Sequence, residues 1–276
     1  MPPAVQFRDA VSLSGGFPLL AGITLEVAEG ESVHLRGPNG AGKTSLLRAC
    51  AGLVAINAGE AEVLGHDLRS DRESLRREVG LMGHGGALYD DLTVEENVRF
   101  AVRAARGDTA AVAPALERLG LSGRLGRTLV GKLSAGQRRR AALASLVARR
   151  PRLWLLDEPH AGLDEIGRAI LDELVAEWQL DGATILLASH ELERAAGLVD
   201  RVVSLAGGHV VSEQPGTRGG PPMTSLPEVE GQAGARSRGR ADGEAAAQSA
   251  GQVRTQPGEL AEAGATGRSE VVADVA

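Results

Sequence analysis

Hydrophobic and polar residues alternate with a period of two in three stretches near the start of the chain, residues 5–13, 23–27 and 31–36. This period is typical of β-strands with one buried face. Residues 45–51 instead show helical spacing and are followed by Gly52. We therefore expect an early antiparallel layer, then a strand, a glycine-rich loop and a helix.

The pattern changes to a helical period after two more short strands. We predict a turn at residues 57–60 and strands at 61–64 and 78–82. Thr93-Val-Glu-Glu96 then has the composition of a capping box, which predicts the start of a helix. Further helical spacing covers residues 110–119 and 134–149, and Pro151 ends the second of these helices.

A continuous apolar run at residues 153–156 opens the next part of the chain. Such a run is typical of a parallel strand that is buried on both faces. Helices and strands then alternate, with helices at 165–180 and 191–199 and strands at 184–188 and 201–205. We expect an α/β fold with a parallel core sheet and a helical subdomain inserted at about residues 84–150.

Composition sets limits on the class of protein. The chain has 276 residues, 43% of them hydrophobic, and a net charge of -6 with a pI near 5.6. An acidic chain of this kind lacks the broad basic surface that nucleic acid requires, so we expect no nucleic-acid partner. The single cysteine, Cys50, is predicted to be buried, and the absence of a disulfide framework indicates a reducing compartment. Neither a targeting segment nor a membrane span is predicted.

The composition shifts again near residue 215. Residues 215–276 are rich in Gly, Ala, Ser, Arg, Glu and Pro, have no aromatic residue and show no sustained period. We predict a folded domain at residues 1–214 and a low-complexity tail at 215–276 that is disordered, because it has too little apolar area to offset its ordering entropy. The alternative is a segment that folds on a partner.

The glycine-rich stretch between strand and helix matches the phosphate-binding pattern G-x-x-x-x-G-K-[ST]. Its glycines allow backbone N–H groups to surround phosphate oxygens, the lysine reaches the outer phosphates, and the threonine hydroxyl ligates Mg²⁺. The alternative, a glycine turn before an ordinary helix, does not account for the strand-loop-helix order. The predicted nucleotide-binding residues are Gly37, Pro38, Asn39, Gly40, Ala41, Gly42, Lys43, Thr44 and Ser45.

Two adjacent carboxylates follow the buried apolar run, in Leu155-Leu156-Asp157-Glu158-Pro159. At the end of a strand their side chains leave in different directions. We expect Asp157 to hold the metal ion, through water, and Glu158 to act as the general base toward an attacking water. The alternative is a solvated acidic turn.

A third motif opens the helix at 134–149. It consists of Leu133, Ser134, Ala135, Gly136 and Gln137, and by itself indicates a helix cap at Ser134. Together with the phosphate loop and the acidic pair, it resembles the LSGGQ signature of ATP-binding-cassette (ABC) ATPases. The resemblance covers residues 1 to about 212. It includes a D-loop at 160–164, with Asp164, and a switch histidine at His190.

The resemblance implies an ATPase with the P-loop NTPase fold of ABC ATPases and with ATP and Mg²⁺ as its cofactors. It further implies a head-to-tail dimer in which Ser134 and Gly136 of one subunit complete the site of the other, while His190 contacts the γ-phosphate and holds Glu158 in register. The second ATPase subunit is an identical or a different chain. The implied location is the cytoplasmic face of the cell membrane, reached through a polytopic permease.

Two positions depart from the family pattern. The family usually has a glutamine at the end of the strand at 79–82, where the spacing gives His84, and we expect this Q-loop position to couple the nucleotide site to the permease. The family also stacks adenine on an aromatic residue. Here the spacing gives Ser14, and the nearest aromatic residue, Phe17, is either a stacking platform or a core residue.

The transported substrate is suggested only by finer resemblance. Gly83-His84, the sequence Leu-Ser-Ala-Gly-Gln-Arg-Arg at 133–139 and the tryptophan in 153–159 resemble the ATPase subunit of the haem exporter of cytochrome c maturation. Two alternatives remain open. One is the ATPase of an exporter of drugs, lipids or polysaccharides, and the other is a soluble ABC ATPase without a transport role.

Overall fold

The computed structural model describes residues 2–83, 88–190 and 199–216, all within one unit that spans residues 1–224. Three sequence predictions lie largely or wholly outside the described residues. These are the role of His84, the helix at 191–199 and the tail, of which only residues 215 and 216 are described.

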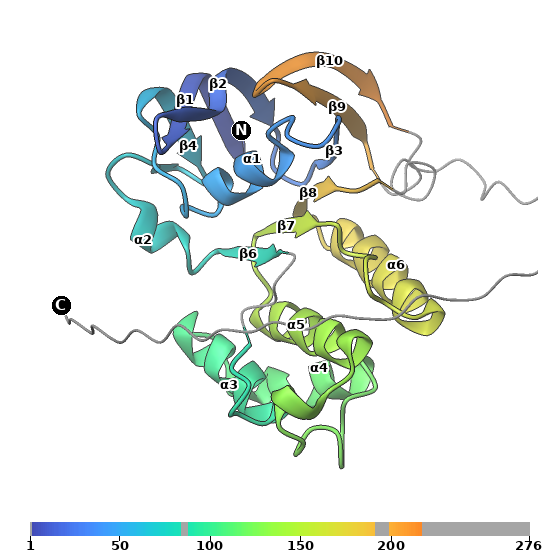
Figure 1. Cartoon of the computed structure of the whole chain (residues 1–276). Coiled ribbons are helices and arrows are strands. Elements are labelled where there is room, and N and C mark those ends of the chain that lie inside the picture. Colours follow the sequence, from blue (N-terminus) through green and yellow to red (C-terminus); the bar gives the residue numbers. More distant parts are fainter. Residues whose placement is uncertain (1, 84–87, 191–198, 217–276) are drawn as a thin grey trace, which may run out of the picture. The chain divides into compact units, whose positions relative to one another are not determined.

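The first sheet forms the predicted antiparallel layer (Figure 1). It contains β1 (Val5–Ser14), β2 (Phe17–Val27), β4 (Ala58–Val63) and β5 (His66–Asp67), in the order β2-β1-β4-β5. Every pairing in it is antiparallel. Alternate residues such as Phe7 and Leu25 are buried, so the period-two pattern correctly located the core side of this sheet.

The predicted turn at residues 57–60 is wrong, because residues 58–60 belong to β4. Gly59 has a φ of 74°, and a Cβ atom there would lie 2.2 Å from the carbonyl oxygen of Asp9. The register between β1 and β4 shifts at this point, between Arg8 and Val11. Gly59 therefore marks an irregularity inside a strand, and glycine is required by the close approach of the neighbouring backbone.

The second sheet is the core of the fold. Its strands are β3 (Ser32–Arg36), β6 (Val79–Met82), β7 (Leu153–Asp157), β8 (Thr184–Ala188), β9 (Arg201–Ala206) and β10 (His209–Pro215), in the order β10-β9-β3-β8-β7-β6. The pairings are parallel except for β10, which runs antiparallel to β9 at the edge. The predicted parallel core sheet is confirmed, whereas β10 was not predicted.

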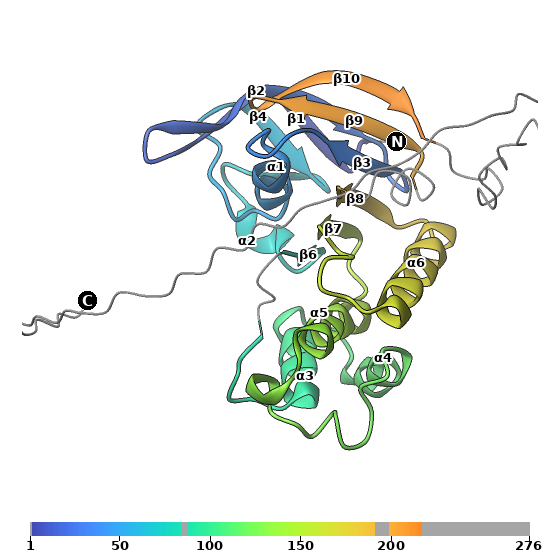
Figure 2. The same cartoon turned by 45° about the vertical axis from the view of Figure 1, so that its right-hand side comes forward.

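Helices follow the strands of this sheet. Helix α1 (Lys43–Cys50) follows β3, the short α2 (Arg72–Leu75) precedes β6, and α6 (Glu165–Leu180) follows β7. Between β6 and β7 the chain forms α3 (Val94–Ala104), α4 (Val112–Arg118) and α5 (Ala135–Arg149), with 3₁₀ turns at Thr109–Ala111 and Val130–Lys132. These three helices form the predicted helical insertion (Figure 2). The predicted capping box is present, with Thr93 as N-cap of α3.

Two hydrophobic clusters lie on opposite faces of the core sheet. Leu153 and Leu155 of β7 belong to the cluster shared with the antiparallel sheet and α1. Trp154 and Leu156 belong to the cluster shared with helices α3 to α6. Burial on both faces explains why β7 is apolar at consecutive positions. Cys50 is buried as predicted, and burial raises the pKa of its thiol above the usual range.

In the described part of the chain, none of the helices combines the length and the apolar character that a membrane crossing requires.

Candidate functional site

The phosphate loop joins β3 to α1 at the carboxyl end of the core sheet. Gly37, Gly40 and Gly42 all have positive φ, at 150°, 78° and 105°. A Cβ atom on Gly37 would lie 2.3 Å from the carbonyl oxygen of Leu205. Gly42 is the N-cap of α1, so the unpaired N–H groups at the start of this helix adjoin the loop. The loop has the geometry of an anion-binding site.

Lys43 and Thr44 lie at the first turn of α1. Lys43 is buried, and its Nζ donates to the carbonyl oxygens of Gly37 at 2.7 Å and Pro38 at 3.1 Å. These bonds hold the positive charge against the loop itself. A phosphate bound by the loop would therefore meet the lysine without a large rearrangement of the backbone.

Thr44 and Asp157 meet although they are far apart in sequence. The Thr44 Oγ1 donates to Asp157 Oδ2 at 2.9 Å, which joins the loop to the end of β7. A hydroxyl and a carboxylate oxygen are the hard donors that Mg²⁺ prefers. The structure thus brings together the two predicted metal ligands, and their chemistry fits this ion.

Glu158 is held toward His190. Its backbone is in the left-handed region, with φ of 47°, which costs about 1–2 kcal/mol for a non-glycine residue. The Glu158 N–H donates to the Ala188 carbonyl at 2.8 Å. The His190 N–H donates to Glu158 Oε2 at 3.2 Å, and His190 Nε2 lies 3.4 Å from Oε1. These contacts place the carboxylate next to the predicted switch histidine.

The signature residues form the start of α5. Ser134 is the N-cap, and it exchanges hydrogen bonds with Gln137 at 3.2 and 3.1 Å, so the predicted helix cap is present. Ser134 and Ala135 are exposed, whereas Leu133 and Gly136 are half-buried. In the described residues, no hydrogen bond joins this motif to the phosphate loop. Its helix start is available to another molecule.

Asp164 has a local role. It is the N-cap of α6, and its side chain accepts from the Gly167 N–H at 2.8 Å. This bond fixes the end of the predicted D-loop, whose Gly162 carbonyl lies next to Gly136.

Arg139 is a site residue that the sequence analysis missed. Its guanidinium is buried and donates to the carbonyl oxygens of Gly83, of Asp157 at 3.2 Å and of Glu158 at 2.7 Å. Burial lowers the pKa of Arg139, and the charges of Asp157 and Glu158 oppose this shift. A signal was present in the sequence, because Arg139 shares a helical face with Leu143 and Leu146.

His34 of β3 is a second buried polar residue near the site. Its Nε2 donates to the Ser189 carbonyl at 3.1 Å, directly before His190, and burial lowers the pKa of the ring. A small pocket of about 290 Å³ lies beside this contact and is lined by Arg36, Gly37, Pro38, Ser189 and His190. The phosphate loop and the switch histidine therefore line the same pocket.

Phe17 is not a core residue, because it is 77% exposed at the start of β2. The carbonyl of Leu19, two residues further along the same strand, lies next to Gly42 of the phosphate loop. Ser14 pairs with Phe17 across the hairpin. The alternative that Phe17 is a core residue is therefore excluded, and its role as a stacking platform stays a prediction. His84, the Q-loop position, lies outside the described residues.

Comparisons with known proteins agree with this geometry. The family described as ABC transporter matches residues 20–161. A cytochrome c biogenesis ATP-binding export protein, CcmA, of Cupriavidus pinatubonensis is 35% identical over 76% of this chain and 92% of its own length. The daunorubicin resistance ATP-binding protein DrrA3 of Streptomyces coeruleorubidus is 36% identical over 76% of this chain and 67% of its own length.

Among solved structures, the chain is similar to the dimeric ATP-binding cassette MJ0796 in a post-hydrolysis state with ADP and Pi. The TM-score is 0.71 at 25% identity, and the match covers 78% of this chain and 99% of the other. A phosphate loop, an acidic strand end and a signature helix thus occur here on the fold of a nucleotide-hydrolysing cassette. The chain belongs to the ABC transporter family, as an ATPase subunit whose hydrolysis of ATP is coupled to transport.

Proposed function

We propose that this ATPase subunit drives a haem exporter that serves cytochrome c biogenesis. The observation that carries the proposal is the similarity to the cytochrome c biogenesis export protein over 92% of that protein's length. The Gly83-His84 step and the tryptophan at position 154, which resemble the same exporters, support it. Trp154 is 2% exposed and packed in the core. It therefore supports the similarity to these exporters but does not itself contact the transported substrate.

Hydrolysis uses residues from three elements. The phosphate loop and Lys43 bind the β- and γ-phosphates of ATP. Thr44 and Asp157 are the residues that would hold Mg²⁺, which offsets the charge that develops on the phosphates. Glu158 accepts the proton of the attacking water at its carboxylate, and His190 keeps that carboxylate in place through its N–H and its ring.

The site is completed by a second subunit, of the same or another sequence. The exposed start of α5, with Ser134 and Gly136, offers N–H groups and a positive helix end to the γ-phosphate bound by the partner. Phe17 supplies the platform for adenine. The dimeric state of the similar cassette supports this arrangement.

A polytopic permease anchors the subunit at the cytoplasmic face of the membrane. An exposed aromatic pair supports this part of the proposal, because Tyr89 is 55% and Phe100 51% exposed, with ring centroids 5.2 Å apart. Buried Asn97 holds the loop beneath them by exchanging hydrogen bonds with the Tyr89 backbone at 2.7 and 3.0 Å. A partner that covers these rings would remove apolar area from water.

A drug exporter is the second candidate, because DrrA3 is similar over the same share of this chain. One experiment separates the two. The chain is expressed with its permease in cells that lack their own cytochrome c biogenesis ATPase, and covalent haem in c-type cytochromes and tolerance to daunorubicin are both measured. Haem export predicts restored cytochromes with unchanged drug tolerance, and the Lys43→Ala variant should restore nothing. Drug tolerance without cytochromes would overturn the proposal.

A further inference from the structure

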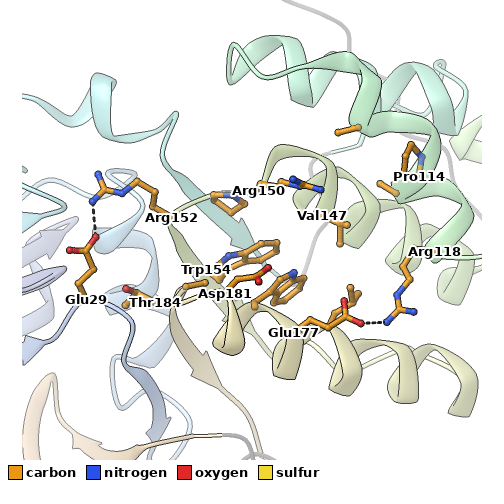
Figure 3. A pocket seen from close by; sticks show the side chains of 17 residues that line it. Glu29, Pro114, Arg118, Val147, Arg150, Arg152, Trp154, Glu177, Asp181 and Thr184 are labelled. Atoms are coloured by element: carbon orange, nitrogen blue, oxygen red, sulfur yellow. Dashed lines mark hydrogen bonds and ion pairs between the residues drawn. The ribbon is translucent and has the colours of Figure 1, made fainter.

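A second pocket lies at the end of the core sheet opposite to the phosphate loop (Figure 3). Its volume is about 640 Å³, which is within the usual range for small-molecule sites of roughly 300–1,000 Å³. Arg152 and Thr184, at the amino ends of β7 and β8, line one side. The last turn of α5, with Val147, and the end of α6, with Asp181, line others. None of its lining residues belongs to the nucleotide site.

The floor of this pocket is aromatic. Trp154 of β7 and Trp178 of α6 stack with ring centroids 3.5 Å apart and an interplanar angle of 17°. Both side chains are largely buried, yet neither indole N–H donates a hydrogen bond to a described residue. Buried indoles usually find an acceptor for this group. The walls, which include Pro114, Val147 and Leu174, are apolar and suit a flat hydrophobic body.

Most charges around the pocket are already neutralised. Arg118 of α4 contacts Glu177 at 2.6 Å and Glu173 at 3.1 Å. Arg152 contacts Glu78 at 2.8 Å and Glu29 at 2.9 Å. These pairs are partly exposed, and their groups are not free to bind a ligand; Figure 3 shows the contacts of Arg152 with Glu29 and of Arg118 with Glu177.

Two charged side chains that line the pocket, one cationic and one anionic, are not neutralised in this way. Among the described residues, the side chains of Arg150 and Asp181 have no hydrogen bond or ion pair, although both line the pocket. Both residues are exposed, and Figure 3 labels both among the residues that line the pocket. The free donors are thus a guanidinium and two indole N–H groups, which suit a carboxylate. The free acceptor is a carboxylate, which suits an ammonium group.

From these features we propose that the pocket binds a small aromatic amino acid or a related flat aromatic zwitterion. Its ring packs against the apolar walls and the small part of the tryptophan pair that the pocket exposes, its carboxylate pairs with Arg150, and its ammonium group pairs with Asp181. The site is separate from the one that binds ATP.

The two tryptophans of the chain both line this pocket, so intrinsic fluorescence reports on it directly. The probe is 4-nitrophenylalanine, whose nitroaryl ring quenches indole fluorescence. Its acid-only and amine-only analogues, 4-nitrophenylacetate and 4-nitrophenethylamine, are titrated in parallel with correction for absorbance. We expect saturable quenching that is tightest for the amino acid.

Two charge-removing variants test the recognition. Because both side chains are exposed and an exposed ion pair is screened by solvent, each variant should weaken binding by about twofold to fivefold. Arg150→Gln should weaken the amino acid and the acid, and Asp181→Asn should weaken the amino acid and the amine. Arg127→Gln, at an exposed position outside the pocket, and Lys43→Ala should leave binding unchanged.

Three results would overturn the proposal. The first is a folded protein with no saturable quenching by any probe into the millimolar range. The second is quenching that neither Arg150→Gln nor Asp181→Asn alters. The third is loss of probe binding in Lys43→Ala, which would place the probe at the nucleotide site.

Discussion

The hydrogen bond between Thr44 and Asp157 shows how much of the site depends on single residues. It spans 113 positions of sequence and joins a helix start to a strand end at 2.9 Å. Glu158, the residue directly after Asp157, instead contacts His190. Neighbouring residues can therefore have different catalytic roles, because the local backbone conformation directs each side chain to a different place.

Lys43 is the residue whose removal should have the most selective effect. Lys43→Ala removes the positive charge that the phosphates require, together with two hydrogen bonds to the loop. We expect ATP hydrolysis to be abolished while the far-UV circular dichroism spectrum is retained. Normal turnover by the purified variant would show that this loop does not bind the phosphates.

His66 predicts a pH dependence of stability. Its ring contacts Asp71 at 2.8 Å and Glu78 at 3.0 Å, and the hydrogen bond to Asp71, followed by that to Glu78, raises the pKa of His66 above its ordinary value of 6.5. Arg152 faces the same carboxylate of Glu78. Because the folded state binds the proton more tightly, this stabilisation is complete below about pH 6.5 and is lost as the pH rises through the raised pKa.

The measurement compares the wild type with His66→Gln. Their difference in melting temperature should shrink as the pH rises above about 6.5, since glutamine does not titrate. A difference that stays constant, or grows with pH, would contradict the role of the protonated ring.

At the scale of elements, Arg139 ties the helical insertion to the core sheet. Its guanidinium links α5 to Gly83, after β6, and to the backbone at the end of β7. The carbonyl oxygens that it holds belong to the residues of the acidic pair. We infer that Arg139 is a positioning residue, which acts on hydrolysis through the placement of Asp157 and Glu158.

Arg139→Gln should lower kcat for ATP by about tenfold or more and leave KM nearly unchanged, because the phosphate loop does not use this residue. It should also lower the free energy of unfolding by about 1.5–3 kcal/mol, the usual contribution of a charged hydrogen bond. Arg139→Lys should restore part of kcat. The control is Arg138→Gln, which removes an exposed ion pair with Asp90. An unchanged kcat in Arg139→Gln would rule out the positioning role.

The strands and helices of the nucleotide site could be predicted from the sequence because each follows from local features, namely its hydrophobic period and its capping, glycine and proline residues. The strand at 184–188 and the helix at 165–180 match the structure residue for residue. Such local features carry no information on contacts between elements that are far apart in the sequence. For this reason the role of Arg139 and the stack of Trp154 on Trp178 were missed. The edge strand β10 was missed because most of it is exposed and polar, without a clear period.

At the scale of the whole molecule, the described contacts end with the Gly216 N–H, which donates to the Asp200 carbonyl at 2.7 Å. Strand β10 extends to Pro215, one residue beyond the predicted domain boundary. We predict that a chain cut after Gly216 keeps the melting temperature and ATPase activity of the full chain, because residues 217–276 are poor in apolar side chains. A large fall in melting temperature would show that this segment contributes to the folded domain.

The central claim is that two copies of this site, or one with a related subunit, close on ATP and use Glu158 to hydrolyse it. The most direct test is to measure, in the same samples, the molar mass by light scattering and the release of phosphate for wild type and Glu158→Gln with ATP and Mg²⁺. The amide keeps the shape of the side chain and loses the basic site, so hydrolysis should fall by about a hundredfold to ten-thousandfold. The variant should then remain as an ATP-bound dimer, whereas the wild type returns to monomer as ATP is consumed. A Glu158→Gln chain that stays monomeric with ATP, or that releases phosphate at the wild-type rate, would contradict the account.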